Sequence, residues 1–221
     1  MSELLKEDVK RQVRDVFVGL PHPVQILFFG SQSNCDYCND TRQLLEEVVA
    51  LSPSLGLTVL DLEADSAAAK FYRVDKAPVF VVAAKDGDTL MDTGIQYAGI
   101  PSGHEFTTLI QDIVLVASRD SGLKETTREY LKALQTPIHL QVFVTPTCPY
   151  CPRAVVLAHR MALENPGMIR AEGVESMEFQ DVANQFNVSG VPQTTINSGA
   201  GTVVGAVPEA NLLAEIQRVI A

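Results

Sequence analysis

The same arrangement of residues occurs twice in this chain, and any fold must accommodate both copies. Each copy has a strand-like run, a Cys-x-x-Cys pair, a helical run and, later, an apolar residue followed by proline. From the first cysteine to that proline there are 43 positions in one copy and 44 in the other. The residues concerned are Cys35, Cys38 and Pro78 in the first copy, and Cys148, Cys151 and Pro192 in the second. This self-similarity predicts a tandem duplication of an α/β unit of roughly 100 residues.

The polar segment 118–122 separates the two copies, and we place the domain boundary there. The expected units are residues 1–118 and 119–221. In the first unit the patterns predict helices at 2–18, 41–50, 66–72 and 104–117, strands at 25–29, 57–63, 79–84 and 89–93, and a loop at 97–103. In the second they predict helices at 123–135, 153–165, 181–186 and 209–220, and strands at 138–144, 174–179, 193–197 and 202–206.

Composition excludes several classes of protein. Hydrophobic residues make up 46% of the chain and charged residues 20%, as in an ordinary globular protein. The longest apolar runs fall short of the roughly 20 residues that a membrane helix needs, so no membrane association is expected. A net charge of -10 argues against nucleic-acid binding, which uses Lys and Arg to neutralise phosphates. Residues 1–8 mix acids and bases without an apolar signal segment, which predicts a cytoplasmic location.

All 4 cysteines fall in the two pairs, which is typical of functional thiols rather than structural disulfides. Each pair lies where a predicted helix begins, and a helix N-terminus favours a negative charge on a nearby sulfur. We therefore expect Cys35 and Cys148 to be thiolate nucleophiles that attack a substrate disulfide. Cys38 and Cys151, about one turn further along, are expected to resolve the mixed disulfide.

Residues 148–151, CPYC, are similar to the glutaredoxin active site, and each unit resembles the thioredoxin/glutaredoxin fold. Two such units in one chain resemble the protein disulfide oxidoreductases of thermophilic archaea and bacteria, as does the stretch 97–106, YAGIPSGHEF. The resemblance implies an α/β fold of two tandem thioredoxin-like units, each a central mixed β-sheet flanked by helices. It implies that Pro78 and Pro192 face the thiols in the cis form. Without the resemblance, both residues read equally as prolines that enter a strand.

The resemblance also implies the partners. These are protein substrates that carry disulfides or thiols, and a thioredoxin-reductase-like flavoprotein as electron donor. No cofactor is expected. Tyr37 and Tyr150 occupy matched places in the two motifs and suggest an apolar, substrate-binding surface beside the thiols, although either side chain could simply fill space.

Glutaredoxins that use glutathione usually carry a Lys three residues before the first cysteine, where this chain has Thr145. They also carry a Gly-Gly-x-Asp-Asp type step, where this chain reads GAVPE at 205–209. Use of glutathione is therefore not implied. The first motif has Asp36 where the second has Pro149, and a negative charge beside Cys35 disfavours its thiolate. We expect the second motif to be the stronger, and the first could be a redox-inert remnant.

Cys-x-x-Cys pairs also bind zinc, but the 113 positions between the two motifs exceed the spacing of a zinc ribbon, so no metal is expected. Three acids, Asp61, Glu63 and Glu178, are placed on strands expected to be covered on both faces. A buried carboxylate there would shuttle the proton of a resolving cysteine. The other interpretation is that all three are solvated acids at strand ends.

These observations predict an enzyme, a dithiol–disulfide oxidoreductase that acts on protein disulfides through both motifs. One alternative is an electron carrier resembling the N-terminal domain of alkyl hydroperoxide reductase flavoproteins, which also fuses two such units. Another is a chaperone-like binding scaffold with passive thiols. The direction of the reaction depends on the reduction potentials of the motifs and on the partner that reduces or oxidises them again after each turnover.

Overall fold

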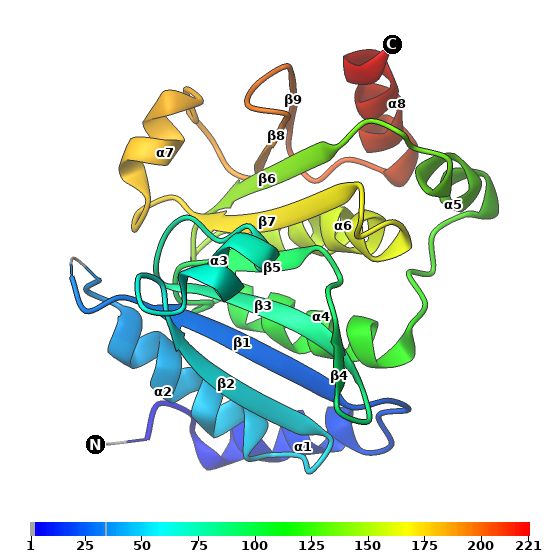
Figure 1. Ribbon diagram of the computed structural model, residues 1–221. Coiled ribbons are helices and arrows are strands. Elements are labelled where there is room, and N and C mark those ends of the chain that lie inside the picture. Colours follow the sequence, from blue (N-terminus) through cyan, green and yellow to red (C-terminus); the bar gives the residue numbers. More distant parts are fainter. Residues whose placement is uncertain (1–2, 34) are drawn as a thin grey trace.

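The computed structural model describes residues 3–33 and 35–221, and this part of the chain forms one nine-stranded sheet with helices on both faces (Figure 1). The first half contains α1 (Glu7–Phe17), β1 (Val24–Gly30), α2 (Cys38–Val49), β2 (Leu55–Asp61), α3 (Ser66–Tyr72), β3 (Val79–Asp86), β4 (Thr89–Met91), β5 (Ile95–Ala98) and α4 (Glu105–Ser118). The second half contains α5 (Glu125–Lys132), β6 (Ile138–Val144), α6 (Cys151–Glu164), β7 (Ile169–Glu175), α7 (Gln180–Gln185), β8 (Gln193–Ile196), β9 (Gly201–Val204) and α8 (Glu209–Ile220).

Three strands in each half are paired in the same way, as the repeat predicts. β1 runs parallel to β2 and antiparallel to β3, and β6 runs parallel to β7 and antiparallel to β8. At the carboxyl ends of the parallel pairs, Gly30 lies opposite Asp61 and Val144 lies opposite Glu175. Asp61 and Glu175 therefore occupy equivalent places in the two halves.

The two halves join edge to edge, because β5 pairs in parallel with β7. The strand order is β2-β1-β3-β5-β7-β6-β8-β9, with β4 paired to β3. The loop predicted at 97–103 is wrong at its start, since Tyr97 and Ala98 belong to β5 and are fully buried. The Gly and Pro residues that follow them indicated a loop. The strands that flank this segment are β3 of the first half and β7 of the second, so no local pattern in the sequence reveals that it is a buried strand.

The strand predicted at 174–179 is also wrong, because β7 begins earlier, at Ile169, and ends at Glu175. Arg170 and Glu172 give β7 a polar appearance in the sequence. Glu172 is nevertheless only 1% exposed, and its Oε1 lies 2.8 Å from Nζ of Lys76 in the first half. A buried carboxylate is tolerated when a partner of opposite charge accompanies it, and this partner is remote in the sequence.

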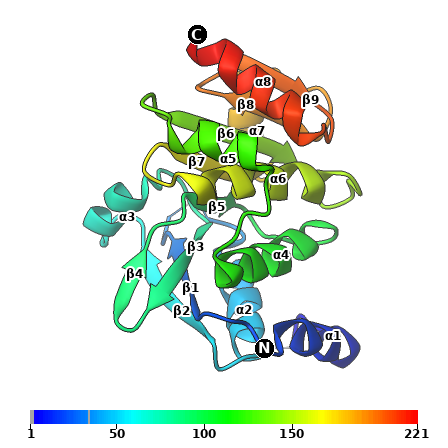
Figure 2. The same ribbon diagram turned by 90° about the vertical axis from the view of Figure 1, so that its right-hand side faces the viewer.

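Helices α3 and α7 cover one face of the sheet, and the other described helices cover the opposite face. Figure 2 shows α3 on one side of the strands and α2 and α4 on the other. On that opposite face α4 of the first half packs against α6 of the second. His159 Nδ1 lies 2.8 Å from Asp112 Oδ1, and His159 Nε2 lies 3.1 Å from the carbonyl oxygen of Gln96. The Asp112 and His159 side chains are completely buried, so this contact is part of the joint between the halves.

The other elements agree with the sequence predictions to within a few residues, and α3, β6 and α8 have the predicted bounds. The helix predicted from residue 2 begins at Glu7, and residue 2 itself lies outside the described residues, as do Met1 and Asn34. Within the described ranges, no helix is long and apolar enough to cross a membrane.

Candidate active sites

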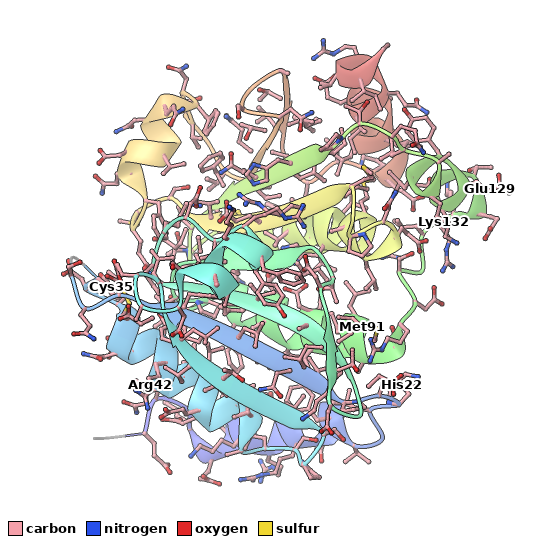
Figure 3. The ribbon with its side chains drawn as sticks, viewed as in Figure 1. His22, Cys35, Arg42, Met91, Glu129 and Lys132 are labelled. Carbon is pink, nitrogen blue, oxygen red and sulfur yellow. A yellow bond between two sulfur atoms is a disulfide. The ribbon has the colours of Figure 1, made fainter. Side chains whose placement is uncertain are left out.

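The first motif lies in the loop that leads into α2, near the Cys35 label in Figure 3. Cys35 and Cys38 form a disulfide, with their Cα atoms 5.4 Å apart. Cys38 is the first residue of α2 and is 8% exposed, whereas Cys35 is only partly buried. The N–H of Ser31 donates to Sγ of Cys38 over 3.3 Å. Of the two sulfurs, that of Cys35 is therefore the one that a substrate reaches first.

The second motif has the same geometry at the start of α6. Cys148 and Cys151 form a disulfide, with Cα atoms 5.5 Å apart. Cys151 is the first residue of α6 and is completely buried, while Cys148 is 8% exposed. Sγ of Cys148 lies 3.7 Å from the carbonyl oxygen of Val191. Here too the second sulfur of the pair is the inner one.

A cis proline accompanies each motif, as the resemblance implies. The peptide bonds Ala77–Pro78 and Val191–Pro192 are both cis. The carbonyl of Pro78 accepts the N–H of Gly99 over 2.9 Å, and the carbonyl of Pro192 accepts the N–H of Gly205 over 2.8 Å. Both prolines also enter a strand, so the plain strand-entry interpretation describes their position but not their isomer.

The two tyrosines do not occupy equivalent surroundings. Tyr37 is 45% exposed and lines a cavity of about 420 Å³ together with Cys35 and Pro78. Tyr150 is 63% exposed and directly precedes α6, as Tyr37 precedes α2. The structure therefore brings Tyr37 to a cavity at its motif and leaves Tyr150 on the open surface beside its own.

The three acids singled out in the sequence lie in different environments. Asp61 ends β2, where the N–H groups of Glu63 and Ala64 donate to its carboxylate. The hydrogen bond from Ala64 is the main reason that the pKa of Asp61 is lowered. Glu63 lies after the strand, exposed, and accepts a hydrogen bond from the Ser31 hydroxyl. Asp61 and Glu63 thus fit the interpretation of strand-end acids, because Asp61 is the last residue of the partly buried strand β2 and Glu63 lies beyond it.

Glu178, like Glu63, is not on a strand, because it follows β7 in the turn before α7. Its Oε1 accepts a hydrogen bond from the N–H of Ile100 over 2.7 Å, so the Glu178 side chain is bound to the first half. Burial, with a smaller contribution from the nearby carboxylate of Glu175, raises the pKa of Glu178 to about 7. Glu178 lines the cavity beside Cys35, so it faces the first motif although it belongs to the second half.

Further acids, missed by sequence reasoning, lie buried at the joint between the halves. Glu105 begins α4 and is completely buried, and burial raises its pKa to about 8. Burial likewise raises the pKa of Glu175 and, more strongly, that of the Tyr97 hydroxyl. Next to Glu105, the N–H of His104 donates to the carbonyl of Pro146 in the loop before Cys148. Only the stretch YAGIPSGHEF, which carried the family resemblance, pointed to this region.

Among residues 3–33 and 35–221, no three His, Cys, Asp or Glu side chains are grouped in a way that would hold a metal ion. The prediction that the working protein contains no zinc stays a prediction.

The comparisons with known proteins agree with this geometry. Residues 138–218 match the model of a thioredoxin domain family. A protein disulfide oxidoreductase from Aeropyrum pernix K1 superimposes with a TM-score of 0.86 at 32% identity, over 95% of this chain and 90% of that one. This chain belongs to the protein disulfide oxidoreductase family. The predicted fold of two tandem thioredoxin-like units and the predicted enzyme class are thereby confirmed.

Relatives of a second kind are longer chains that contain a region similar to this one. The N-terminal domain of the alkyl hydroperoxide reductase AhpF from Enterococcus faecalis superimposes with a TM-score of 0.85 at 26% identity, over 95% of this chain and 98% of that one. An alkyl hydroperoxide reductase protein from Staphylococcus epidermidis is 28% identical over 86% of this chain. The chain spans about a third of the length of these curated relatives.

Membership of the family and two disulfide-bonded Cys-x-x-Cys motifs make this chain a dithiol–disulfide oxidoreductase. Its partners are molecules with thiols or disulfides, because thiol–disulfide exchange requires one on each side.

Proposed function

We propose that both motifs act on protein disulfides, with Cys35 and Cys148 as nucleophiles and Cys38 and Cys151 as resolving thiols. The observation that supports this assignment best is the exposure of the sulfurs. In each pair the first cysteine is the more exposed one and the second lies at the first residue of a helix. A substrate disulfide therefore meets the first sulfur, and the second is held within reach of it.

In the reducing direction, the nucleophilic thiolate attacks one sulfur of the substrate disulfide and expels the other as a thiolate. The resolving cysteine, once deprotonated, attacks the nucleophile's sulfur in this mixed disulfide, which closes the Cys-x-x-Cys disulfide and releases the second substrate thiolate. Two electrons thus pass from the protein to the substrate. The same steps in reverse oxidise a substrate dithiol.

Regeneration of the dithiol needs an external donor of two electrons, and we propose a thioredoxin-reductase-like flavoprotein for that role. We also propose residues 1–118 and 119–221 as the two catalytic units, and a cytoplasmic location as the sequence predicts. Pro78 and Tyr37 would contact substrate at the first motif, where both line the cavity beside Cys35. Pro192 and Tyr150 would do so at the second.

A second candidate is an electron-carrier module that serves a peroxide-reducing system. The observation in its favour is the match with the N-terminal domain of the Enterococcus faecalis alkyl hydroperoxide reductase, which covers nearly all of both chains. In that case the reduced protein would pass its electrons to one partner protein rather than to many substrates.

Insulin reduction with dithiothreitol as donor tests the proposal. The wild-type chain should accelerate the precipitation of insulin chains, and a variant with all four cysteines replaced by Ser should not. If that variant still changes the aggregation of insulin as strongly as the wild type, the chaperone-like alternative is correct. If the wild type is inactive on insulin but the reduced protein sustains peroxide consumption by a thiol peroxidase, the electron-carrier alternative is correct.

A further inference from the structure

The cavity beside Cys35 is built from both halves of the molecule. Its lining from the first half is the motif and the cis-proline loop, namely Cys35, Asp36, Tyr37, Ala77 and Pro78. Its lining from the second half is the turn between β7 and α7, namely Met177, Glu178 and Phe179. In Figure 1 this turn lies at the same side of the sheet as the loop that leads into α2. With about 420 Å³ beside the more exposed sulfur, the cavity has room for a side chain that flanks a substrate disulfide.

The two carboxylates of this lining, Asp36 and Glu178, are its only charged side chains among the described residues. Asp36 is exposed, and Glu178 is held by its hydrogen bond from the Ile100 N–H. The other carboxylate oxygen of Glu178, Oε2, is buried and has no hydrogen-bond partner among the described residues. Lys76 precedes the lining residue Ala77, but its Nζ is engaged by Glu172 at 2.8 Å and Asp75 at 2.6 Å. The described lining therefore presents negative charge without a basic side chain to balance it.

The surroundings of the second motif differ in charge. Its counterpart of Asp36 is the uncharged Pro149, and Arg153 is exposed shortly after Cys151. The glycine that supports the cis proline differs as well. Gly99 packs against the side chains of Glu175 and Glu178, whereas no described atom of another segment lies within 4 Å of where a side chain on Gly205 would begin. The carboxylate of Glu178 therefore distinguishes the first motif from the second.

We propose that the first motif selects protein disulfides flanked by Lys or Arg, with Glu178 and Asp36 forming the pocket for that cation. Complementary charge favours the matching partner and penalises the wrong one. Glu178 thus acts in the reaction of the other unit, as a specificity-determining residue. This inference rests on the oxidoreductase function proposed above for Cys35 and Cys38, and it adds no step to that chemistry.

The charge of the pocket depends on pH. The groups that face Glu178 are Glu175 on β7, Tyr97 on β5 and, across the cavity, Asp36. The pKa of Tyr97 is raised well above its ordinary value, so its hydroxyl stays neutral. Since the pKa of Glu178 is raised to about 7, the pocket gains a negative charge as the pH rises through neutrality. The preference for a cation is expected to grow in the same direction.

The test uses a Cys148→Ser, Cys151→Ser background, in which only the first motif reacts. Two synthetic disulfide peptides differ only in having Lys or Glu beside the cysteine, and kcat/KM is measured for each. The ratio of the two values cancels the ionisation of the Cys35 thiol, which affects both peptides equally. Near pH 8 we expect the Lys peptide to react at least about ten-fold faster, a difference of about 1.4 kcal/mol.

Two substitutions at the pocket should reduce that ratio. Glu178→Gln keeps a hydrogen-bond acceptor for the Ile100 N–H and should lower the ratio about five-fold near pH 8, but little near pH 6. Asp36→Asn should lower it at both pH values, because it removes the other carboxylate that lines the cavity. Glu129→Gln on α5, far from the motif, removes the same charge and should leave the ratio unchanged (Figure 3).

A Cys35→Ser, Cys38→Ser background, which leaves the second motif, should show little preference between the peptides. If the first motif reduces both peptides at equal rates, or if neither pocket substitution lowers the ratio, the specificity pocket is refuted while the oxidoreductase function stands. If the first motif reduces neither peptide nor insulin, the function proposed for it fails, and the pocket with it.

Discussion

The two halves place equivalent residues in opposite surroundings. Asp61 ends β2 at the outer edge of the sheet, and hydrogen bonds from neighbouring N–H groups lower its pKa. Glu175 ends β7 in the middle of the sheet, and burial raises its pKa. The repeat predicts the same strand in both places, but joining the halves through β5 and β7 buries only one of them.

The two Cys-x-x-Cys motifs differ for the same reason. The turn after β7 reaches the first motif because β7 lies next to the first half, and it carries Glu178 with it. The corresponding turn of the first half follows β2, which lies at the other end of the strand order, away from the second half. Duplication followed by edge-to-edge joining therefore produces two unlike sites from one repeated unit.

The largest effect that tests this comparison is the loss of activity on removing one motif. We expect Cys148→Ser to abolish most insulin reduction and Cys35→Ser to abolish little, because the charge of Asp36 disfavours a thiolate on Cys35. Assaying both variants with the same reductant measures the difference. The reverse order of losses would make the first motif the stronger, and Asp36→Pro should strengthen the first site if the charge is the cause.

The joint between the halves should respond much more strongly to substitution than the outer surface. Lys76→Met removes the ammonium that lies 2.8 Å from the buried carboxylate of Glu172, with only the more distant charges of Arg170 and His139 left among the groups that act on it, and should lower the free energy of unfolding by about 3 kcal/mol. Arg42→Met breaks an exposed ion pair with Glu46 and should cost less than about 0.5 kcal/mol. Urea unfolding of both variants is the measurement. Equal losses would show that the joint contributes no more than the surface.

Glu105, buried at the joint, and Asp61, at the outer edge of the sheet, should give stability opposite dependences on pH. The pKa of Glu105 rises from 4.5 to about 8 on folding, so between these values the folded state holds a proton that the unfolded state has lost. The contribution of Glu105 to the free energy of unfolding therefore declines as the pH rises from 4.5 to about 8. Glu105→Gln should flatten the decline by about 1 kcal/mol per pH unit in urea unfolding.

Asp61 has a lowered pKa, so its contribution is present above its ordinary value of 3.8 and is lost as the pH falls below it. Asp61→Asn should reduce the loss of stability that occurs as the pH falls, whereas Glu105→Gln reduces a loss that occurs as the pH rises. A profile unchanged by either substitution would contradict the comparison.

The smallest effect is on the ionisation of the nucleophilic thiols. In a Cys35→Ser, Cys38→Ser background, we expect the alkylation of Cys148 by iodoacetamide to titrate below the free thiol value of about 8.5, since a helix N-terminus favours the thiolate. In the reciprocal background, Cys35 should titrate higher by about one unit. If the midpoint for Cys148 is at or above the free value, the helix N-terminus does not lower the pKa of this thiol.

The sequence by itself determined the features that short stretches of chain encode. The spacing of Cys35, Cys148 and the two prolines identified the repeat, and strand and helix periodicities gave most elements nearly their observed bounds. These signals are local, because a helix or strand shows its buried side within a few residues. The resemblance supplied the cis prolines, which no local pattern would have predicted.

Only the tertiary structure decided how the halves meet. Tyr97 resembles a loop residue and Glu172 a surface residue until β5 and β7 pair, when both become buried. Glu178 becomes part of the first site only when its turn crosses the joint, and Glu105 acquires its raised pKa only there. The physical reason is that burial and charge pairing depend on neighbours distant in the chain, whose approach no pattern in one segment records.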